Sequence, residues 1–235
     1  PVAAVGGDLL RGYLHERTGV PGPLAIGAIV VDLTTEVTAQ LAFAGFALVL
    51  LLLAGHDDGT ALPLLVGLLI LILLVVGFYL AQRRELFSRA IKIFEGVLGI
   101  QAPAGSAYAQ SLDRMIRELY RSQSRVRASV LFHLLAWLSG ALQMYAAAMF
   151  LGRPIGWQDA LILEGLVTAV RAAAFMIPGG LGVQEGGFIL VGGLIGLSPE
   201  VALALALIRR VRELVLGIAG IIAWQWRTIA QVAAR

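Results

Sequence analysis

Residues 62–82 constrain the fold most strongly, because they form an almost unbroken run of Leu, Ile and Val. A helix of about 20 apolar residues spans the hydrocarbon core of a bilayer. The rest of the chain has a similar character: 59% of its 235 residues are hydrophobic and only 14% are charged. A soluble domain has roughly a quarter charged residues. The sequence therefore predicts an all-α, polytopic membrane helix bundle.

The apolar runs and the breaks between them divide a single membrane domain, residues 1–235, into six segments. These are a first re-entrant segment (1–22), two transmembrane spans (23–82), a basic segment (83–127), two membrane helices (128–177), a second re-entrant segment (178–198) and a last transmembrane span (199–228). The chain starts at Pro1 in the middle of a pattern, so we expect N-terminal helices to be missing from it.

The basic segment 83–127 holds nine of the eighteen Lys and Arg residues. Within it, Phe87, Ile91, Phe94 and Leu98 recur at helical spacing, which is typical of an amphipathic helix in the membrane interface. A solvated basic loop is the alternative. Under the positive-inside rule both interpretations place the segment and the C-terminus in the cytoplasm. We expect the segment to contact an anionic lipid surface.

The stretch "IPGGLGVQEGG" (177–187) places five glycines and one carboxylate, Glu185, between two apolar runs. The apolar piece that follows, 186–197, has about twelve residues and covers roughly half of a membrane at ~1.5 Å per residue. This pattern predicts a glycine-broken re-entrant helix. A short buried helix beneath a long loop is the alternative.

The two ends of the chain share a pattern of breaks, acids and turns. A shift of 177 positions places Asp8 on Glu185, Gly19 on Gly196, Asp32 on Arg209 and Glu36 on Glu213. Each unit then has a glycine break, an acid, a short helix, a Gly/Pro turn and a long charged helix. The pattern predicts an inverted repeat with two re-entrant helices, as in many transporters. Identities are few, so coincidence stays open.

Charged residues recur inside the predicted membrane helices. They are Asp8, Asp32, Glu36, Glu164, Glu185 and Glu213 against Arg11, Arg171, Arg209, Arg210 and Arg212. Each such charge costs roughly 2.5–3.5 kcal/mol at the centre of a helix, so these residues should not face lipid. Mutual ion pairs that fix helix packing are one interpretation. The other is a polar cavity in which guanidinium groups and helix N-termini bind a phosphate headgroup.

Several classes of function find no support in the residues. The chain has no cysteine, which excludes disulfides and thiolate metal sites, and its three histidines have no zinc spacing. We expect His133 to be a packed, hydrogen-bonded residue. Gly180 and Gly182 superficially resemble a dinucleotide fingerprint, but no strand precedes them. No enzyme activity, catalytic residue, cofactor, metal or nucleic-acid partner is predicted.

Three segments carry a resemblance to a known family. "GGDLLR" (6–11), "PGGLGVQEG" (178–186) and "ALIRRVRE" (206–213) together resemble the flippase-like membrane domain of the lysylphosphatidylglycerol synthase family. "VVDLTTEVTAQLAF" (30–43) is similar to the hopanoid-biosynthesis-associated branch of that family. The resemblance implies a bacterial inner-membrane protein that moves an aminoacylated phospholipid, or a hopanoid-type lipid, between leaflets. The synthase activity belongs to a soluble domain that these residues do not include.

Matching positions imply a site for a lipid headgroup. The matching residues are Gly6, Gly7, Asp8, Arg11, Pro178, Gly179, Gly180, Gly182, Glu185, Arg209 and Glu213. Arg212 is added to the predicted headgroup residues because it lies within roughly 100° of Arg209 and Glu213 around the same helix. The predicted polar lining of the cavity is Asp32, Glu36, Gln40, Glu164 and Arg171. The leading hypothesis is a lipid translocase. An ion- or proton-coupled solute transporter and a non-transporting scaffold stay open, as do a homodimer and a lipid-biosynthetic enzyme as partner.

Overall fold

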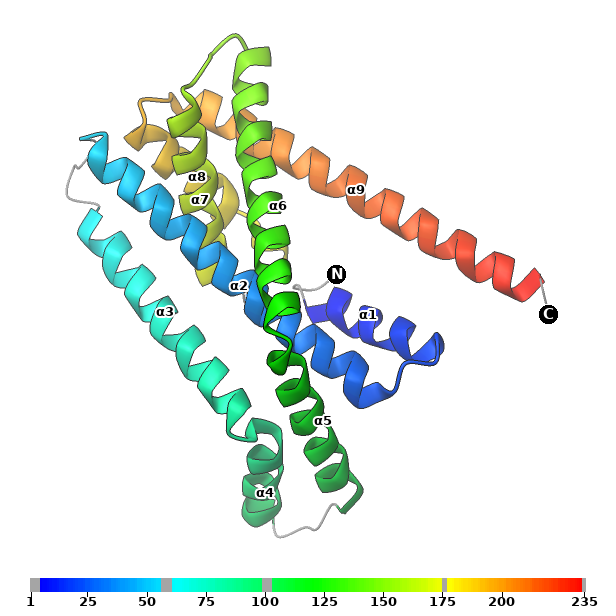
Figure 1. Cartoon of the computed structure of the whole chain (residues 1–235). Helices are drawn as coiled ribbons and strands as arrows, with labels where there is room; N and C mark the ends of the chain where they lie inside the picture. The colour runs from blue at the N-terminus through cyan, green and yellow to red at the C-terminus, as the bar shows by residue number, and fades with distance from the viewer. Residues whose placement is uncertain (1–4, 56–60, 99–102, 175–176, 234–235) are drawn as a thin grey trace.

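The computed structural model describes residues 5–55, 61–98, 103–174 and 177–233, and these residues form helices with no strand among them (Figure 1). The helices are α1 (Val5–Arg17), α2 (Gly22–Leu53), α3 (Ala61–Arg83), α4 (Leu86–Leu98), α5 (Pro103–Arg121), α6 (Gln123–Phe150), α7 (Trp157–Ala173), the 3-10 turn η1 (Pro178–Gly180), α8 (Val183–Leu194) and α9 (Pro199–Ala233). The predicted all-α fold is confirmed.

Helix α2 is the central element of the bundle. It packs against α1, α3, α5, α6 and α7, and Figure 1 shows it running through the middle of the molecule. Pro23 lies in its first turn, which suits a helix start because proline lacks the N–H that a first turn leaves unpaired. Among the described helices, α2 and α6 meet the length and composition needed to cross a membrane.

The main apolar core lies where α2, α6, α7, α8 and α9 meet. Its buried residues include Ala47, Met144, Leu163, Phe188 and Ala202. Small residues allow close contact between these helices, which is how membrane helices pack when lipid removes the hydrophobic drive between them. At Gly165 of α7, for example, an added Cβ would lie 2.5 Å from the Cβ of Ala47. The packing of the core therefore requires small residues, such as Gly165 and Ala47, where two helices cross.

The outer face of the bundle is apolar and exposed. Leu73 of α3 is 71% exposed, Phe132 of α6 71% and Leu216 of α9 63%, as expected for surfaces that face lipid chains. The C-terminal part of α9 extends away from the other helices (Figure 1).

The basic segment forms the two helices α4 and α5, so the helical interpretation of its periodicity is confirmed and the loop is not. Buried Asp113 of α5 accepts hydrogen bonds from the backbone N–H of Phe87 (3.2 Å) and of Ser88 (2.8 Å). These N–H groups belong to the first turn of α4, which otherwise leaves them unpaired. Leu112 and Ile116 attach α5 to Val31 of α2.

The helix bounds repeat along the chain with the predicted spacing. A shift of 177 positions carries Arg17, the end of α1, onto Leu194, the end of α8. The same shift carries Gly22, the start of α2, onto Pro199, the start of α9. Between them, Gly19 and Gly196 both have φ near +80°, at +87° and +79°. Each unit is thus a short helix, a glycine turn and a long helix.

Several predicted bounds differ from the structure. Gly6 and Gly7 lie inside the first turn of α1 rather than in a break before it, and the second break ends at Gly182. Helix α6 begins at Gln123, five residues before the predicted 128, because Arg125 and Arg127 are good helix formers despite their charge. Hydropathy marks where a helix is apolar, whereas backbone hydrogen bonds decide where it ends.

Candidate functional site

A cavity of about 610 Å³ lies between α2 on one side and α7, η1 and α9 on the other, with α6 beside it. Its lining combines charged and polar side chains with glycine backbone: Glu36, Gln40, Trp137, Thr168, Arg171, Gly179, Gly180, Arg209, Arg210, Arg212 and Glu213, with Ala172, Ala174, Ile177 and Leu214 as apolar members. The volume lies in the range of small-ligand sites. We call it the charged cavity.

A buried ion pair forms the floor of the charged cavity. Arg209 of α9 donates to Glu164 of α7 at 2.7 Å, and the two side chains are only 3% and 2% exposed. The Arg209 Nε also lies 3.5 Å from Glu213, one turn further along α9. Buried charges need partners and hydrogen bonds to offset lost hydration, and this pair has both.

A second arginine connects three helices above that floor. Arg171 of α7 donates to Glu213 of α9 at 2.5 Å and to Gln184 of α8 at 3.0 Å. Gln184 is fully buried, and its amide nitrogen also reaches the carbonyl oxygen of Ala206 at 3.4 Å. The predicted residues Arg171 and Glu213 are thus direct partners.

The predicted glycine turn holds the chain close to these arginines. Gly179, Gly180 and Gly182 have φ of +64°, +61° and +79°, a region that side chains with a Cβ rarely adopt. A Cβ at Gly180 would lie 3.2 Å from Cγ of Arg171. Glycine here therefore allows both the left-handed backbone and the close approach to Arg171.

Glu185 stabilises the start of α8 and binds α9. Its carboxylate accepts from the backbone N–H of Gly182 at 2.9 Å and forms an ion pair with Arg210 at 2.7 Å. An acid in the first turn also interacts favourably with the helix dipole. Arg210 donates in addition to the carbonyl oxygen of Gly179 at 3.3 Å. Glu185 itself is outside the lining and acts through Arg210.

Within the described residues, the lining side chains of Arg212, Trp137 and Glu36 each have a polar group for which no hydrogen bond is found. The Nε atoms of Arg212 and of Trp137 are buried and make no hydrogen bond, and both residues line the charged cavity. Glu36, on the opposite wall, forms no hydrogen bond or ion pair within the described residues. Gln40, one turn from Glu36, donates to the carbonyl oxygen of Thr168 at 2.8 Å.

Trp137 and Thr168 are two polar lining residues that the sequence did not predict. Trp137 lies at the midpoint of α6, whereas tryptophan in membrane proteins gathers at the two interfaces. Its position in the middle of a predicted membrane helix is the sequence feature that could have indicated a role inside the bundle.

The α1 residues of the predicted site lie in a different cluster. Arg11 donates to Asp32 of α2 at 2.7 Å, and His133 of α6 contacts the same carboxylate at 3.2 Å. This confirms the prediction of a hydrogen-bonded His133. Gly7, Asp8 and Arg11 are not part of the lining of the charged cavity, and Asp32 is one helical turn from Glu36. The structure thus divides the predicted headgroup residues between two clusters.

Comparison with known proteins gives one result. No curated protein and no solved structure matches the chain significantly. The family predicted from residues 6–11, 178–186 and 206–213 is confirmed. The family model described as the lysylphosphatidylglycerol synthase TM region matches residues 1–220, and the chain belongs to that membrane-domain family.

Proposed function

We propose that this protein is a lipid translocase in which the charged cavity receives the headgroup while the acyl chains stay in the bilayer. One observation carries the proposal: Arg212 lines the charged cavity and forms no ion pair with any described residue. A cation in a low-dielectric site is costly without a partner. A phosphate group in the cavity would supply the anion that the Arg212 guanidinium lacks.

Ion pairing alone accounts for only part of the charge in the lining. Three of the four lining arginines have acidic partners, namely Arg171 with Glu213, Arg209 with Glu164 and Arg210 with Glu185. Within the described residues, Arg212 on one wall and Glu36 on the other form no ion pair. A cation and an anion facing one cavity fit a headgroup that carries both a phosphate and an amine. A hopanoid-type cargo without phosphate would leave Arg212 unexplained.

The repeated helix bounds support a transport mechanism. In inverted-repeat transporters, broken helices meet near the bilayer midplane, and one repeat moves against the other to expose the site to each side in turn. The units α1–α2 and α8–α9 match over a shift of 177 positions and each contribute a wall of the charged cavity. By the positive-inside rule, α4, α5 and the C-terminus face the cytoplasm of a bacterial inner membrane.

The test is lipid movement in vesicles that contain the full chain. Analogues of phosphatidylethanolamine and of phosphatidylglycerol that carry a fluorescent label in one acyl chain, and so keep their native headgroups, are scored by chemical quenching of the label in the outer leaflet. Arg212→Gln should slow movement by roughly 10–100-fold, the factor expected for a lost charge-assisted hydrogen bond. Trp137→Phe should slow it less. Arg125→Gln, an exposed arginine of α6 outside the lining, is the matched control and should have no effect.

The outcomes separate the three hypotheses. Movement that needs Arg212 supports the translocase. A solute-dependent current without any lipid requirement favours the coupled transporter. If the folded protein moves no lipid, and neutralising Arg212 or Glu36 changes nothing in cells, the scaffold replaces the proposal.

A further inference from the structure

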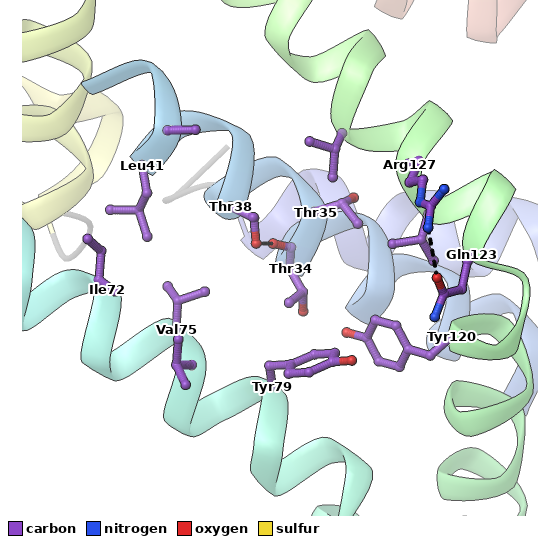
Figure 2. A pocket seen from close by; sticks show the side chains of 14 residues that line it. Thr34, Thr35, Thr38, Leu41, Ile72, Val75, Tyr79, Tyr120, Gln123 and Arg127 are labelled. Atoms are coloured by element: carbon purple, nitrogen blue, oxygen red, sulfur yellow. Dashed lines mark hydrogen bonds between the residues drawn. The ribbon is translucent and has the colours of Figure 1, made fainter. Parts of the chain in front are cut away.

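A second cavity, of about 490 Å³, lies on the other side of α2 (Figure 2). Its walls come from α2, α3, the end of α5 and the first two turns of α6. None of its lining residues belongs to the predicted headgroup site or to the charged cavity. We call it the hydroxyl cavity after the threonines and tyrosines in its wall.

Helix α2 is the partition between the two cavities. Glu36 and Gln40 line the charged cavity, whereas Thr34, Thr38 and Leu41 line the hydroxyl cavity. At ~100° per residue, Glu36 and Thr38 point about 160° apart while lying only ~3 Å apart along the axis. The two cavities therefore overlap in depth on opposite faces of one helix.

One end of the hydroxyl cavity suits a hydrocarbon chain. Leu41, Ile72 and Val75 gather there in Figure 2. The threonine hydroxyls of the same wall are already used, because Thr34 donates to the carbonyl oxygen of Val30 (2.8 Å) and Thr38 to that of Thr34 (2.7 Å). Because both hydroxyl protons are donated to carbonyl oxygens of α2, these groups do not need a hydrogen-bond acceptor from a ligand. A CH₂ chain can lie against them without leaving a donor unpaired.

The other end of the hydroxyl cavity is polar. The rings of Tyr79 and Tyr120 meet edge to face with centroids 5.0 Å apart. Burial raises the pKa of the Tyr120 hydroxyl, which stays protonated and donates to Gln82 at 2.8 Å. Gln82 in turn donates to the hydroxyl oxygen of Thr34 at 3.0 Å. Tyr120, Gln82 and Thr34 thus hydrogen-bond to one another at the floor of the cavity.

Arg127 stands at the polar end with an unneutralised charge. Its guanidinium donates to the amide oxygen of Gln123, one turn earlier, at 3.1 Å, and it has no acidic partner within the described residues (Figure 2). The neighbouring α4 and α5 belong to the basic segment, so an anion is favoured at this side of the membrane. The cavity thus runs from a cation to a hydrocarbon-like interior.

We propose that the hydroxyl cavity binds an anionic phospholipid, with its phosphate at Arg127 and one acyl chain between α2 and α3. The gradient from charge to apolar wall matches the gradient along such a lipid. A helix of a second copy would bring no phosphate for Arg127. Since α2 separates the two cavities, the proposal is independent of the proposed translocase and stands if translocation fails.

Photocrosslinking tests the acyl-chain end. The full chain is placed in lipid nanodiscs with phosphatidylglycerol that carries a diazirine in one acyl chain, and labelled peptides are mapped by mass spectrometry. We expect labels on the cavity-facing residues of α2 and α3. Val75→Trp fills the cavity and should abolish these labels, as should Ala42→Trp from the opposite wall. Ile70→Trp, on the face of α3 opposite the cavity and 54% exposed, is the control and should preserve them.

Headgroup selectivity tests the charged end. With matched diazirine probes, wild-type protein should be labelled more strongly by phosphatidylglycerol than by phosphatidylcholine. Arg127→Gln should lower labelling by phosphatidylglycerol about tenfold, the effect of one charge-assisted hydrogen bond, and leave labelling by phosphatidylcholine unchanged. Arg125→Gln, outside the cavity, should change neither. Labels spread evenly over the outer face of α3, or unaffected by both tryptophan variants, would overturn the proposal, as would equal labelling by the two lipids.

Discussion

The two ion-pair clusters beside the charged cavity each include one residue at a matching position of the two units, yet their surroundings differ. Asp32 of α2 and Arg209 of α9 correspond under the shift of 177 positions, and each forms its shortest ion pair at 2.7 Å. Arg209 and Glu164 are 3% and 2% exposed, whereas Arg11 and Asp32 are 49% and 28% exposed. The pair between α9 and α7 is thus sealed, whereas the pair between α1 and α2 is open.

Because of this difference in exposure, we expect the two clusters to have different roles in stability. A sealed pair cannot lose one partner without leaving a bare charge in a low-dielectric interior. An exposed pair has less of its charge in a low-dielectric interior, so it contributes less to stability and separates at lower cost. We expect the α7–α9 cluster to hold the helices together and the Arg11–Asp32 pair to exchange partners.

Breaking the sealed pair should have the largest effect. Arg209→Met removes the cation and leaves Glu164 buried without its main partner, so we expect a loss of about 3–5 kcal/mol in the free energy of unfolding. Thermal unfolding of the purified protein in detergent measures it.

The double variant is the control for that prediction. Arg209→Met with Glu164→Leu removes both charges and should recover most of the lost stability, because no buried charge then lacks a partner. A double variant as unstable as Arg209→Met alone would show that packing, rather than the unpaired charge, sets the cost.

Crowding the sealed pair should have an intermediate effect. A Cβ at Gly140 of α6 would collide with the carboxylate of Glu164, so Gly140→Ala should cost about 1–3 kcal/mol by the same measurement. In the open unit, a Cβ at Gly12 would meet only the tips of Ile26 (3.1 Å) and Ile29 (3.3 Å). Gly12→Ala is the matched control and should lie within about 1 kcal/mol of wild type, since alanine favours the helix. Equal losses at both glycines would contradict the contrast.

Breaking the open pair should have the smallest effect on stability. Arg11→Gln removes a half-exposed ion pair, which is worth about 0–1 kcal/mol, and Asp32 keeps its contact with His133. The loss in the free energy of unfolding is measured by thermal unfolding of this variant at low and at high salt. A loss comparable to that of Arg209→Met would mean that the two clusters share one structural role.

Local pattern was enough to predict the helical parts and most of the charged residues of the site. The amphipathic spacing in 83–127 predicted helices because only one face of α4 and of α5 needs apolar contact. The cost of charge in a membrane required Glu164, Arg171, Arg209 and Glu213 to face one another or a cavity. Helix ends were less predictable, as the early start of α6 shows.

Partner choice and cavity shape required the tertiary structure. Spacing on α9 placed Arg209 and Arg212 near one face, but the crossing of α7 decided that Arg209 is paired with Glu164 and that Arg212 is not. Trp137 enters the lining through the angle between α6 and α2, which no local pattern encodes.

The sequence by itself determined an all-α membrane domain, its family, the glycine turn before α8 and the set of charges that cannot face lipid. Hydropathy, helical period and the cost of buried charge are local properties, and a single segment expresses each of them. Only the tertiary structure decided that α2 separates two cavities, one charged and one lined by hydroxyl and apolar groups. Which faces of a helix meet depends on crossings between segments more than a hundred residues apart, such as Gln40 with Thr168.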